Sequence, residues 1–483
     1  MSSRLLIPIA ASIAVHAAHA AIISVPGDAP SIQPAIDAAA AGDTIVVAAG
    51  TYTGAQNKNL DFGGKDLVLA GAGGALATVL DCEGDGAGLH LHSGETRASL
   101  ITGFTITRGT GAPFGNGSSN GGGGIMLDQS SPTIRECIVE GNNVSTIGGG
   151  VFMDRGSSPL IDRCIIRNNF GAEMSGGIAS GRNSTADIVD CTVSGNRAPA
   201  AGGIGIFLSE QGPRISGCEI FDNQVFAAGG GILIVGGTGT IDDCVIRNNT
   251  AGVTVEENIM GGGILVIAQA SATVTHSRIE GNVSTFAGGG VAVSELSSIT
   301  MSHCRIKDNH GEAFGAGLYF SMSEGAVTHT VVDGNRLDSN FGSGGGTLLA
   351  ASNVAFEHCT FIGNGGGFLG ADLAGDGEVS FVNSILRSTG RRLPSQFEGE
   401  KTIRYSNVLG GAAGEGNIDA EPRFESKGGF DYVLWRNSPC IDSGTGADDG
   451  LDWCAINTGY CRFNSQASDM GAYGGAGNVG WME

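Results

Sequence analysis

The feature that most constrains this chain is a repeat of about 27 residues, which occurs nine times between Cys137 and Asn364. Each copy contains a glycine run with an aliphatic residue, a turn of small residues, and an apolar strand with a register position that is usually cysteine. Asparagine follows that position five residues later, and the first four intervals between register positions are 27, 27, 27 and 26 residues. This recurrence predicts a solenoid in which each coil packs only on its neighbours.

Alternation within the strands indicates which side chains face the core. Aliphatic residues stand two positions after the register residue, as at Ile166, and three positions before it, as at Ile161. We expect both to point inward, together with the register cysteines. The asparagines, about 4.8 Å apart in successive coils, should form a buried ladder in which each amide bonds the next amide and the local backbone. The ladder comprises Asn142, Asn169, Asn196, Asn223, Asn249, Asn282, Asn309, Asn335 and Asn364.

Composition supports one long domain. The chain has 84 Gly in 483 residues without a collagen period, and 41% of its residues are hydrophobic, which excludes collagen and argues against disorder. A solenoid grows coil by coil, so this length does not require several domains. The formal net charge of −22 disfavours nucleic acid as a partner.

The N-terminus has the form of a cleaved secretory signal. Arg4 precedes an apolar run over residues 5–15, and Ala18-His19-Ala20 resembles a cleavage site. We therefore expect cleavage near Ala20 and export, with no transmembrane segment in the mature chain; an uncleaved anchor is the alternative. The predicted divisions are a signal peptide at 1–20, an N-terminal cap at 21–59, a β-helix at 60–390 and an irregular C-terminal cap at 391–483.

The cap should contain a short amphipathic helix over residues 31–41, with Ile32, Ala35, Ile36 and Ala39 on one face, followed by a strand over 44–48. Such a helix can cover the open end of a solenoid. At the other end, the period is lost from Arg391 onward, where charges, proline and cysteine appear.

Several motifs resemble those of right-handed parallel β-helix proteins in the pectate-lyase-like superfamily. Gly289-Gly290-Val291 and Phe361-Ile362-Gly363-Asn364 are similar to the repeats of polymorphic outer membrane proteins. The resemblance implies an all-β, right-handed parallel β-helix of roughly ten regular coils, preceded by irregular coils and the cap helix. It implies little about activity, because the superfamily contains lyases, hydrolases, epimerases and adhesins.

Seven of the eleven cysteines occupy the inward register. The Cβ atoms of equivalent cysteines in neighbouring coils should be about 4.8 Å apart, which is outside the usual range for a disulfide. We therefore interpret these residues as buried thiols, with metal or redox chemistry as the alternative. In the predicted C-terminal cap, Cys440, Cys454 and Cys461 allow at most one disulfide among themselves, and Cys454 with Cys461 is the preferred pair.

A column of histidines is the main candidate site. The residue before the register position is histidine in four successive coils, and cations stand at outward positions on the adjoining strand. Bases, acids and cations on one strand face could bind an acidic glycan, and a base there could abstract a proton. The predicted substrate-binding residues are His276, His303, His329, His358, Arg278, Arg305 and Lys307. The catalytic candidates are His303, Arg278, Arg305, Lys307 and Asp243.

Asp243 is included among the catalytic candidates because Asp242-Asp243-Cys244 and Arg305-Ile306-Lys307 look like two of the four polygalacturonase motifs. Both fragments also occupy positions that belong to the repeat. A solvated polar column at a turn and a metal site are the alternatives for the whole patch. The loop over residues 250–260 could wall a groove, or be a tolerated insertion.

No cofactor is required by this interpretation. A Ca²⁺ site is possible in the predicted C-terminal cap, where Asp442, Asp448, Asp449 and Asp452 supply oxygen ligands, and turn-forming aspartates are the alternative. We predict a monomeric, exported, non-catalytic bacterial scaffold that acts at the cell surface or binds carbohydrate. The competing hypothesis is a polysaccharide lyase or glycoside hydrolase that acts on an acidic polysaccharide.

Overall fold

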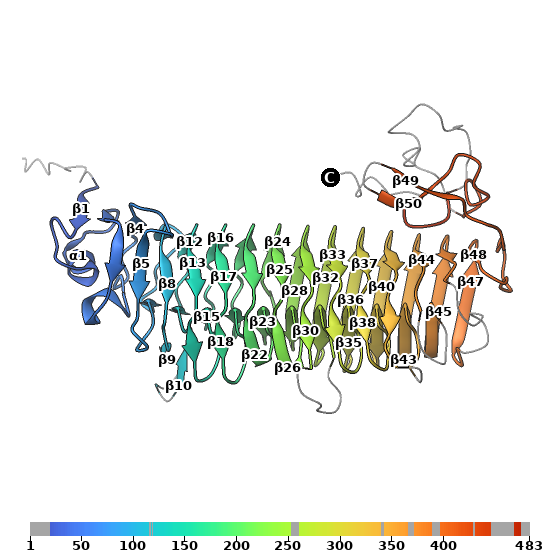
Figure 1. Cartoon of the computed structure of the whole chain (residues 1–483), viewed down its shortest axis with the longest axis horizontal. Helices are drawn as coiled ribbons and strands as arrows, with labels where there is room; N and C mark the ends of the chain where they lie inside the picture. The colour runs from blue at the N-terminus through green and yellow to red at the C-terminus, as the bar shows by residue number, and fades with distance from the viewer. Residues whose placement is uncertain are drawn as a thin grey trace, which may run out of the picture.

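The chain winds into a long solenoid of stacked parallel strands (Figure 1). The computed structural model describes residues 20–114, 117, 119–252, 260–339, 342–365, 371–388, 397–427, 430–445 and 468–474. A regular coil contains four strands, such as β15 (Val151–Asp154), β16 (Leu160–Asp162), β17 (Ile165–Arg167) and β18 (Phe170–Gly171). Each pairs with its equivalents in the neighbouring coils, which gives four stacks, here called the first to the fourth.

The remaining strands extend these stacks. The first stack contains β6 (Leu89–Leu91), β11 (Ile125–Asp128), β19 (Ile178–Ser180), β23 (Ile204–Phe207), β27 (Ile232–Val235), β31 (Ile264–Ile267), β35 (Val291–Ser294) and β39 (Leu318–Ser321). The second contains β1 (Ile22–Val25), β2 (Thr44–Val47), β4 (Val68–Gly71), β7 (Leu100–Thr102), β12 (Thr133–Arg135), β20 (Asp187–Val189), β24 (Arg214–Ser216), β28 (Thr238–Asp242), β32 (Ser271–Thr275), β36 (Ser298–Ser302), β40 (Glu324–Thr328) and β47 (Glu400–Arg404). The long strands β43 (Thr347–Glu357) and β45 (Leu373–Val382) run through both stacks.

The third stack is a 14-stranded sheet. Besides β17 it contains β3 (Gly50–Tyr52), β5 (Thr78–Asp81), β8 (Thr105–Thr107), β13 (Ile138–Glu140), β21 (Thr192–Ser194), β25 (Glu219–Phe221), β29 (Val245–Arg247), β33 (Arg278–Glu280), β37 (Arg305–Lys307), β41 (Val331–Asp333), β44 (Thr360–Ile362), β46 (Ile385–Leu386) and β48 (Asn407–Val408). The fourth contains β14 (Asn143–Val144), β22 (Arg197–Ala200), β26 (Gln224–Ala228), β30 (Thr250–Ala251), β34 (Val283–Ser284), β38 (His310–Gly311) and β42 (Arg336–Leu337). Two antiparallel pairs lie outside the stacks, β9 (Ala112–Phe114) with β10 (Ser119–Gly121) and β49 (Phe424–Lys427) with β50 (Phe430–Leu434).

The core confirms the predicted orientation of the side chains. Ile161, Cys164 and Ile166 are buried in one continuous apolar cluster that runs through the solenoid. The asparagines form the expected ladder: Asn169 donates its side-chain amide to Asn196 Oδ1 at 3.0 Å and to the backbone carbonyl of Val139 at 2.9 Å. The ladder therefore satisfies buried polar groups at the turn between the third and fourth stacks.

Two backbone features explain the remaining sequence pattern. The residue before the register position turns the chain from the second stack into the third in the left-handed conformation, as at Arg163 with φ of 49°. The glycine run forms the turn between the fourth stack and the first. A Cβ added at Gly148 would lie 2.7 Å from the Cβ of Phe152, so this position requires glycine.

At the N-terminus, α1 (Ile32–Ala38) buries Ile32, Ala35 and Ile36 against the first coils, and η1 (Ala55–Asn57) follows. The helix is shorter than the predicted 31–41 because Ala39 adopts an extended backbone. Lys65 Nζ donates to the carbonyls of Ile36 and Ala39, at 2.5 and 3.1 Å. A cation at a helix C-terminus is favourable, so this contact stabilises the cap.

The parallel strands continue beyond residue 390, because β47 pairs with β45 and β48 pairs with β46. One further coil thus lies in the segment that the sequence assigned to the C-terminal cap. The described residues after β48 fold back over the third stack near the C-terminal end of the solenoid (Figure 1). We call residues 430–445 and 468–474 the tail.

Candidate functional site

The outer faces of the stacks differ in what covers them. On the first stack, Leu265, Tyr319 and Leu348 point outward but are buried, and they pack with the partly buried Phe286 and Phe314 that precede the next strand. The tail covers part of the third stack. Among the described residues, few cover the outer face of the second stack, and one that does is Arg97, which reaches across to the carbonyl of Ser158 and to Asp187. In the C-terminal half of the second stack, outward residues such as Glu324, Asn353 and Glu378 are exposed.

The four predicted histidines do form a column at the corner between the second and third stacks. Their φ angles are 49°, 53°, 46° and 49°, so the same left-handed turn positions each ring. Neighbouring rings are stacked, with centroid separations of 5.3, 4.9 and 5.0 Å from His276 to His358. Asp243 occupies the same corner one coil before His276 and is exposed.

The environment of the histidines changes along the column. His276 Nδ1 lies 2.9 Å from Asp242 Oδ1 and is partly exposed. At the other end, His329 and His358 are buried, with 8% and 5% of their surfaces exposed. Burial lowers the pKa of His358 to about 4, while a hydrogen bond with the backbone of Asp469 acts in the opposite direction. His358 is thus held in the neutral state at neutral pH.

Arg305 is engaged inside the protein. Its Nη2 lies 2.9 Å from Asp333 Oδ2 on the third stack and 2.8 Å from Asp431 Oδ2 in the tail. Burial opposes the charge of this guanidinium, but hydrogen bonds to the two carboxylates raise its pKa above its ordinary value. Arg278 remains exposed, and Lys307 Nζ lies 3.9 Å from Asp308 Oδ2. The cationic strip is therefore only partly available to a ligand.

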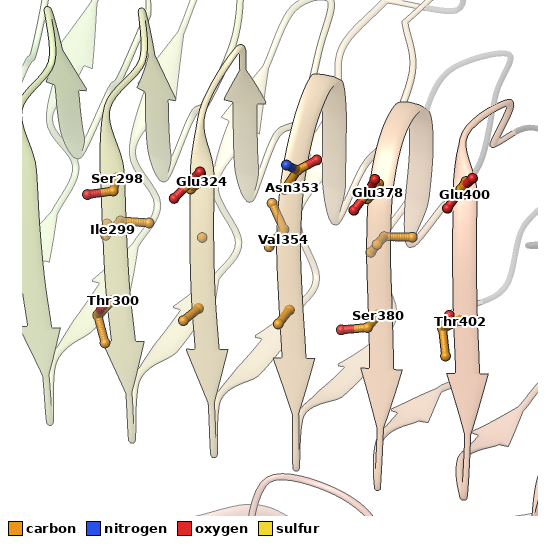
Figure 2. A pocket seen from close by; sticks show the side chains of 14 residues that line it. Ser298, Ile299, Thr300, Glu324, Asn353, Val354, Glu378, Ser380, Glu400 and Thr402 are labelled. Atoms are coloured by element: carbon orange, nitrogen blue, oxygen red, sulfur yellow. The ribbon is translucent and has the colours of Figure 1, made fainter.

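A groove on the second stack was not predicted from the sequence. It has a volume of about 450 Å³ and extends from β36 across β40, β43 and β45 to β47 (Figure 2). One row of side chains on its surface consists of Ser298, Glu324, Asn353, Glu378 and Glu400, which are paired in register from strand to strand. A second row consists of Thr300, Ala326, Ala355, Ser380 and Thr402.

Periodicity could have located this groove. Each member of the first row stands five residues before the corner residue of its coil, as Glu324 stands before His329 and Asn353 before His358. The sequence does not single out this row, because polar residues at outward strand positions are ordinary surface residues unless their coils are aligned in space. Only the stacked arrangement shows that hydroxyl, amide and carboxylate groups share one groove.

The register thiols and the predicted calcium ligands remain to be placed, and Asp442 is the one predicted calcium ligand among the described residues, where it is exposed. The register thiols are buried and unlinked, and burial raises the pKa of Cys304 and of Cys359 to about 12. The backbone N–H of Asp442 donates a hydrogen bond to Asp469 Oδ1 at 2.7 Å. The remaining predicted ligands and the preferred disulfide lie outside the described residues; these are Asp448, Asp449, Asp452, Cys454 and Cys461. Most of the loop 250–260 and the predicted signal peptide also lie outside them.

Among the described residues, no group of three His, Cys, Asp or Glu side chains could hold a metal ion. Within the same part of the chain, no helix is long and apolar enough to span a membrane.

The family described as the right-handed β-helix region matches residues 67–257 and 239–391. These segments cover more than half of the sequence. The chain belongs to the right-handed β-helix family. The predicted fold and handedness are confirmed, whereas the likeness to polymorphic outer membrane proteins stays a prediction.

Three solved structures resemble the chain at low similarity. Pectate lyase Pel9A is 14% identical over 94% of this chain and 96% of its own, with a TM-score of 0.35. The A-module of mannuronan C-5 epimerase AlgE4 from Azotobacter vinelandii is 14% identical over 80% and 94%, with a TM-score of 0.31. The catalytic domain of a GH87 α-1,3-glucanase in complex with nigerose is 13% identical over 78% and 67%, with a TM-score of 0.28. No curated protein matches the chain in sequence.

Proposed function

We propose that this protein is an exported, non-catalytic β-helix that binds an extended carbohydrate chain along the groove of the second stack. The observation that carries the proposal is the repetition of sugar-compatible groups across five strands of one open groove. Hydroxyl, amide and carboxylate side chains can each bond a sugar hydroxyl. Successive coils lie about 4.8 Å apart, so equivalent contacts recur along an extended glycan and add together.

The groove is a better candidate for the glycan-binding surface than the histidine column. Glu324, Glu378 and Glu400 are exposed along one row, whereas Arg305 already contacts two internal carboxylates. Three carboxylates in a protein of net charge −22 disfavour a polyanion in the groove by like-charge repulsion. We therefore expect a neutral glycan, or one with cationic groups, to bind better than a polyuronate.

Binding is favoured over hydrolysis by the surroundings of the carboxylates. A glycosidase acid is typically a carboxyl group in an apolar pocket that stabilises its protonated form. The three glutamates of the groove instead lie on an exposed strand face. Their arrangement suits hydrogen bonding to a ligand more than proton donation.

A steric block provides the test. Ala326 is exposed on the groove surface, so Ala326→Trp should fill the groove without disturbing the core. Ser194→Trp places the same side chain at an outward position of the third stack, away from the groove, and serves as the matched control. Retention on neutral, cationic and anionic polysaccharides should be measured for both variants and the parent.

The proposal expects retention of a neutral or cationic glycan by the parent and by Ser194→Trp, with at least tenfold weaker retention by Ala326→Trp, an energy of about 1.4 kcal/mol or more. Equal retention by all three proteins would exclude the groove. The same mixtures should be analysed for shortened chains. Cleavage that is lost in Glu378→Gln would assign the alternative, an enzyme.

A further inference from the structure

The tail is attached to the third stack by polar and apolar contacts. Apolar packing joins Val331 of β41 to Val433, Ala472 and Tyr473 of the tail. The backbone N–H of Ala472 donates to Thr360 Oγ1 at 3.0 Å, and Asp431 pairs with Arg305. A second buried cluster joins Ile385 of β46 to Cys440 and Met470 of the tail. The tail is therefore a layer over the solenoid that is held by two apolar clusters and by polar contacts.

Asn383 connects this layer to the buried end of the histidine column. Its side-chain amide nitrogen lies 2.8 Å from the carbonyl of Thr445 and 3.1 Å from His358 Nε2. Its Oδ1 accepts the N–H of Thr445 at 2.7 Å, and its backbone carbonyl accepts the N–H of Gly471 at 2.7 Å. One residue thus holds both described parts of the tail and contacts the imidazole.

The direction of the contact with His358 matters. An amide nitrogen can only donate, so His358 Nε2 must accept and must carry no proton. Protonation at this nitrogen would place two donors opposite each other and remove the bond. Because the same amide nitrogen contacts Thr445, loss of its acceptor at His358 disturbs the attachment of the tail.

From these contacts we infer that the tail is an acid-released cover: protonation of His358 displaces Asn383 and uncovers the third stack beside the histidine column. This device is independent of the glycan groove, which lies on the second stack. The uncovered surface would include Arg305, which exchanges its contact with Asp431 for solvent or an anionic ligand.

The charged and titratable groups between the tail and the third stack are Arg305, Asp333, Asp431, Tyr432 and Tyr473. Glu357 precedes His358 in the chain, and a hydrogen bond with the backbone of Asp469 favours the charged form of His358. His329 stacks on His358 at 5.0 Å, so a charge on one ring disfavours a charge on the other.

The sign of the pH dependence follows from burial. The pKa of His358 is lowered from 6.5 to about 4 in the covered state and returns toward 6.5 on release. The covered state is therefore fully stable above about pH 6.5 and loses stability as the pH falls toward 4. The equilibrium should shift toward release by about tenfold at pH 5.5, and by roughly 300-fold over the whole titration.

The chain contains a selective reporter for this motion. All three tryptophans, Trp435, Trp453 and Trp481, follow β48 in the sequence, so tryptophan fluorescence reports on the C-terminal segment alone. Quenching of this fluorescence, together with amide hydrogen exchange of residues 430–434 and 468–474 corrected for intrinsic rates, should be followed from pH 7.5 to 4.5 in the full chain. Circular dichroism should show that the solenoid stays folded.

We expect tryptophan quenching and amide hydrogen exchange of the tail to increase in the parent as the pH falls. His358→Gln, which cannot become charged, should keep the tail protected down to pH 4.5. His276→Gln, at the exposed end of the column, should behave as the parent does. Release of the tail in His358→Gln with the parent's pH profile would overturn the inference.

If His358→Gln leaves the tail uncovered already at pH 7.5, the variant cannot test the pH dependence. The His358 ring of the parent should then be titrated by NMR. The inference requires that its apparent pKa coincide with the midpoint of tail exchange and lie below 6.5. A His358 ring that titrates near 6.5 while the tail stays protected would contradict it.

Discussion

Replacement of Asn223 by leucine tests the ladder on which the stacked coils depend. Asn223 Oδ1 accepts bonds from the backbone N–H and the side-chain amide of Asn196, both at 3.0 Å. Its amide nitrogen donates to the carbonyl of Val193 at 2.9 Å and to Asn249 Oδ1 at 3.0 Å. Asn223 is fully buried, so water cannot replace these partners.

Leucine would leave two donors of Asn196 without their acceptor. Each buried unsatisfied group costs about 1–3 kcal/mol, so Asn223→Leu should lower the free energy of unfolding by roughly 2–6 kcal/mol. The midpoint of urea unfolding, followed by circular dichroism, measures the change. Asp222→Gly is the control, because Asp222 is left-handed with φ of 54° and glycine takes that position at Gly195. An unchanged midpoint in Asn223→Leu would refute the ladder's role as a stabilising element.

Three further predictions follow from particular contacts. Cys304 and Cys359 should resist alkylation at pH 8 in the native protein, because burial raises their pKa to about 12; mass spectrometry after denaturation without reductant should find most register thiols free, and disulfides between consecutive coils would contradict this. Lys65→Met should lower the free energy of unfolding by about 1 kcal/mol, since the carbonyls at the end of α1 lose a cation, and a melting temperature equal to the parent's would exclude that role. Arg305→Met should weaken the attachment of the tail at neutral pH, because Asp431 loses its partner and the buried Asp333 is left without a counter-charge; tryptophan quenching equal to that of the parent would show that Arg305 does not hold the tail.

The contacts of Arg305 change one expectation from the sequence. The sequence pattern predicts that replacing Arg278, Arg305 and Lys307 together removes ligand binding without loss of folding. Arg305 lies between Asp333 and Asp431, so its removal should also disturb the tail. Arg278, which is exposed, is the cleaner probe of an anionic ligand at the histidine column.

The sequence by itself determined the coil. A period near 27 residues, an inward cysteine and an asparagine five residues later are local signals, and each must satisfy the same geometry in every coil. The spacing alone therefore assigns Asn196 and Asn223 to one ladder, and Cys164 and Cys191 to the core. The same alignment of coils predicts the column from His276 to His358.

Which outer faces of the coil are covered depends on the tertiary structure. The tail lacks the repeat, so nothing in its sequence indicated that Asp431 would meet Arg305 or that Asn383 would hold Thr445. The groove likewise depends on which outward faces remain open, and the burial of the first stack and of part of the third leaves the second stack free. A repeat fixes contacts between neighbouring coils because their spacing is constant, whereas contacts between residues far apart in the sequence depend on how non-repeating segments pack.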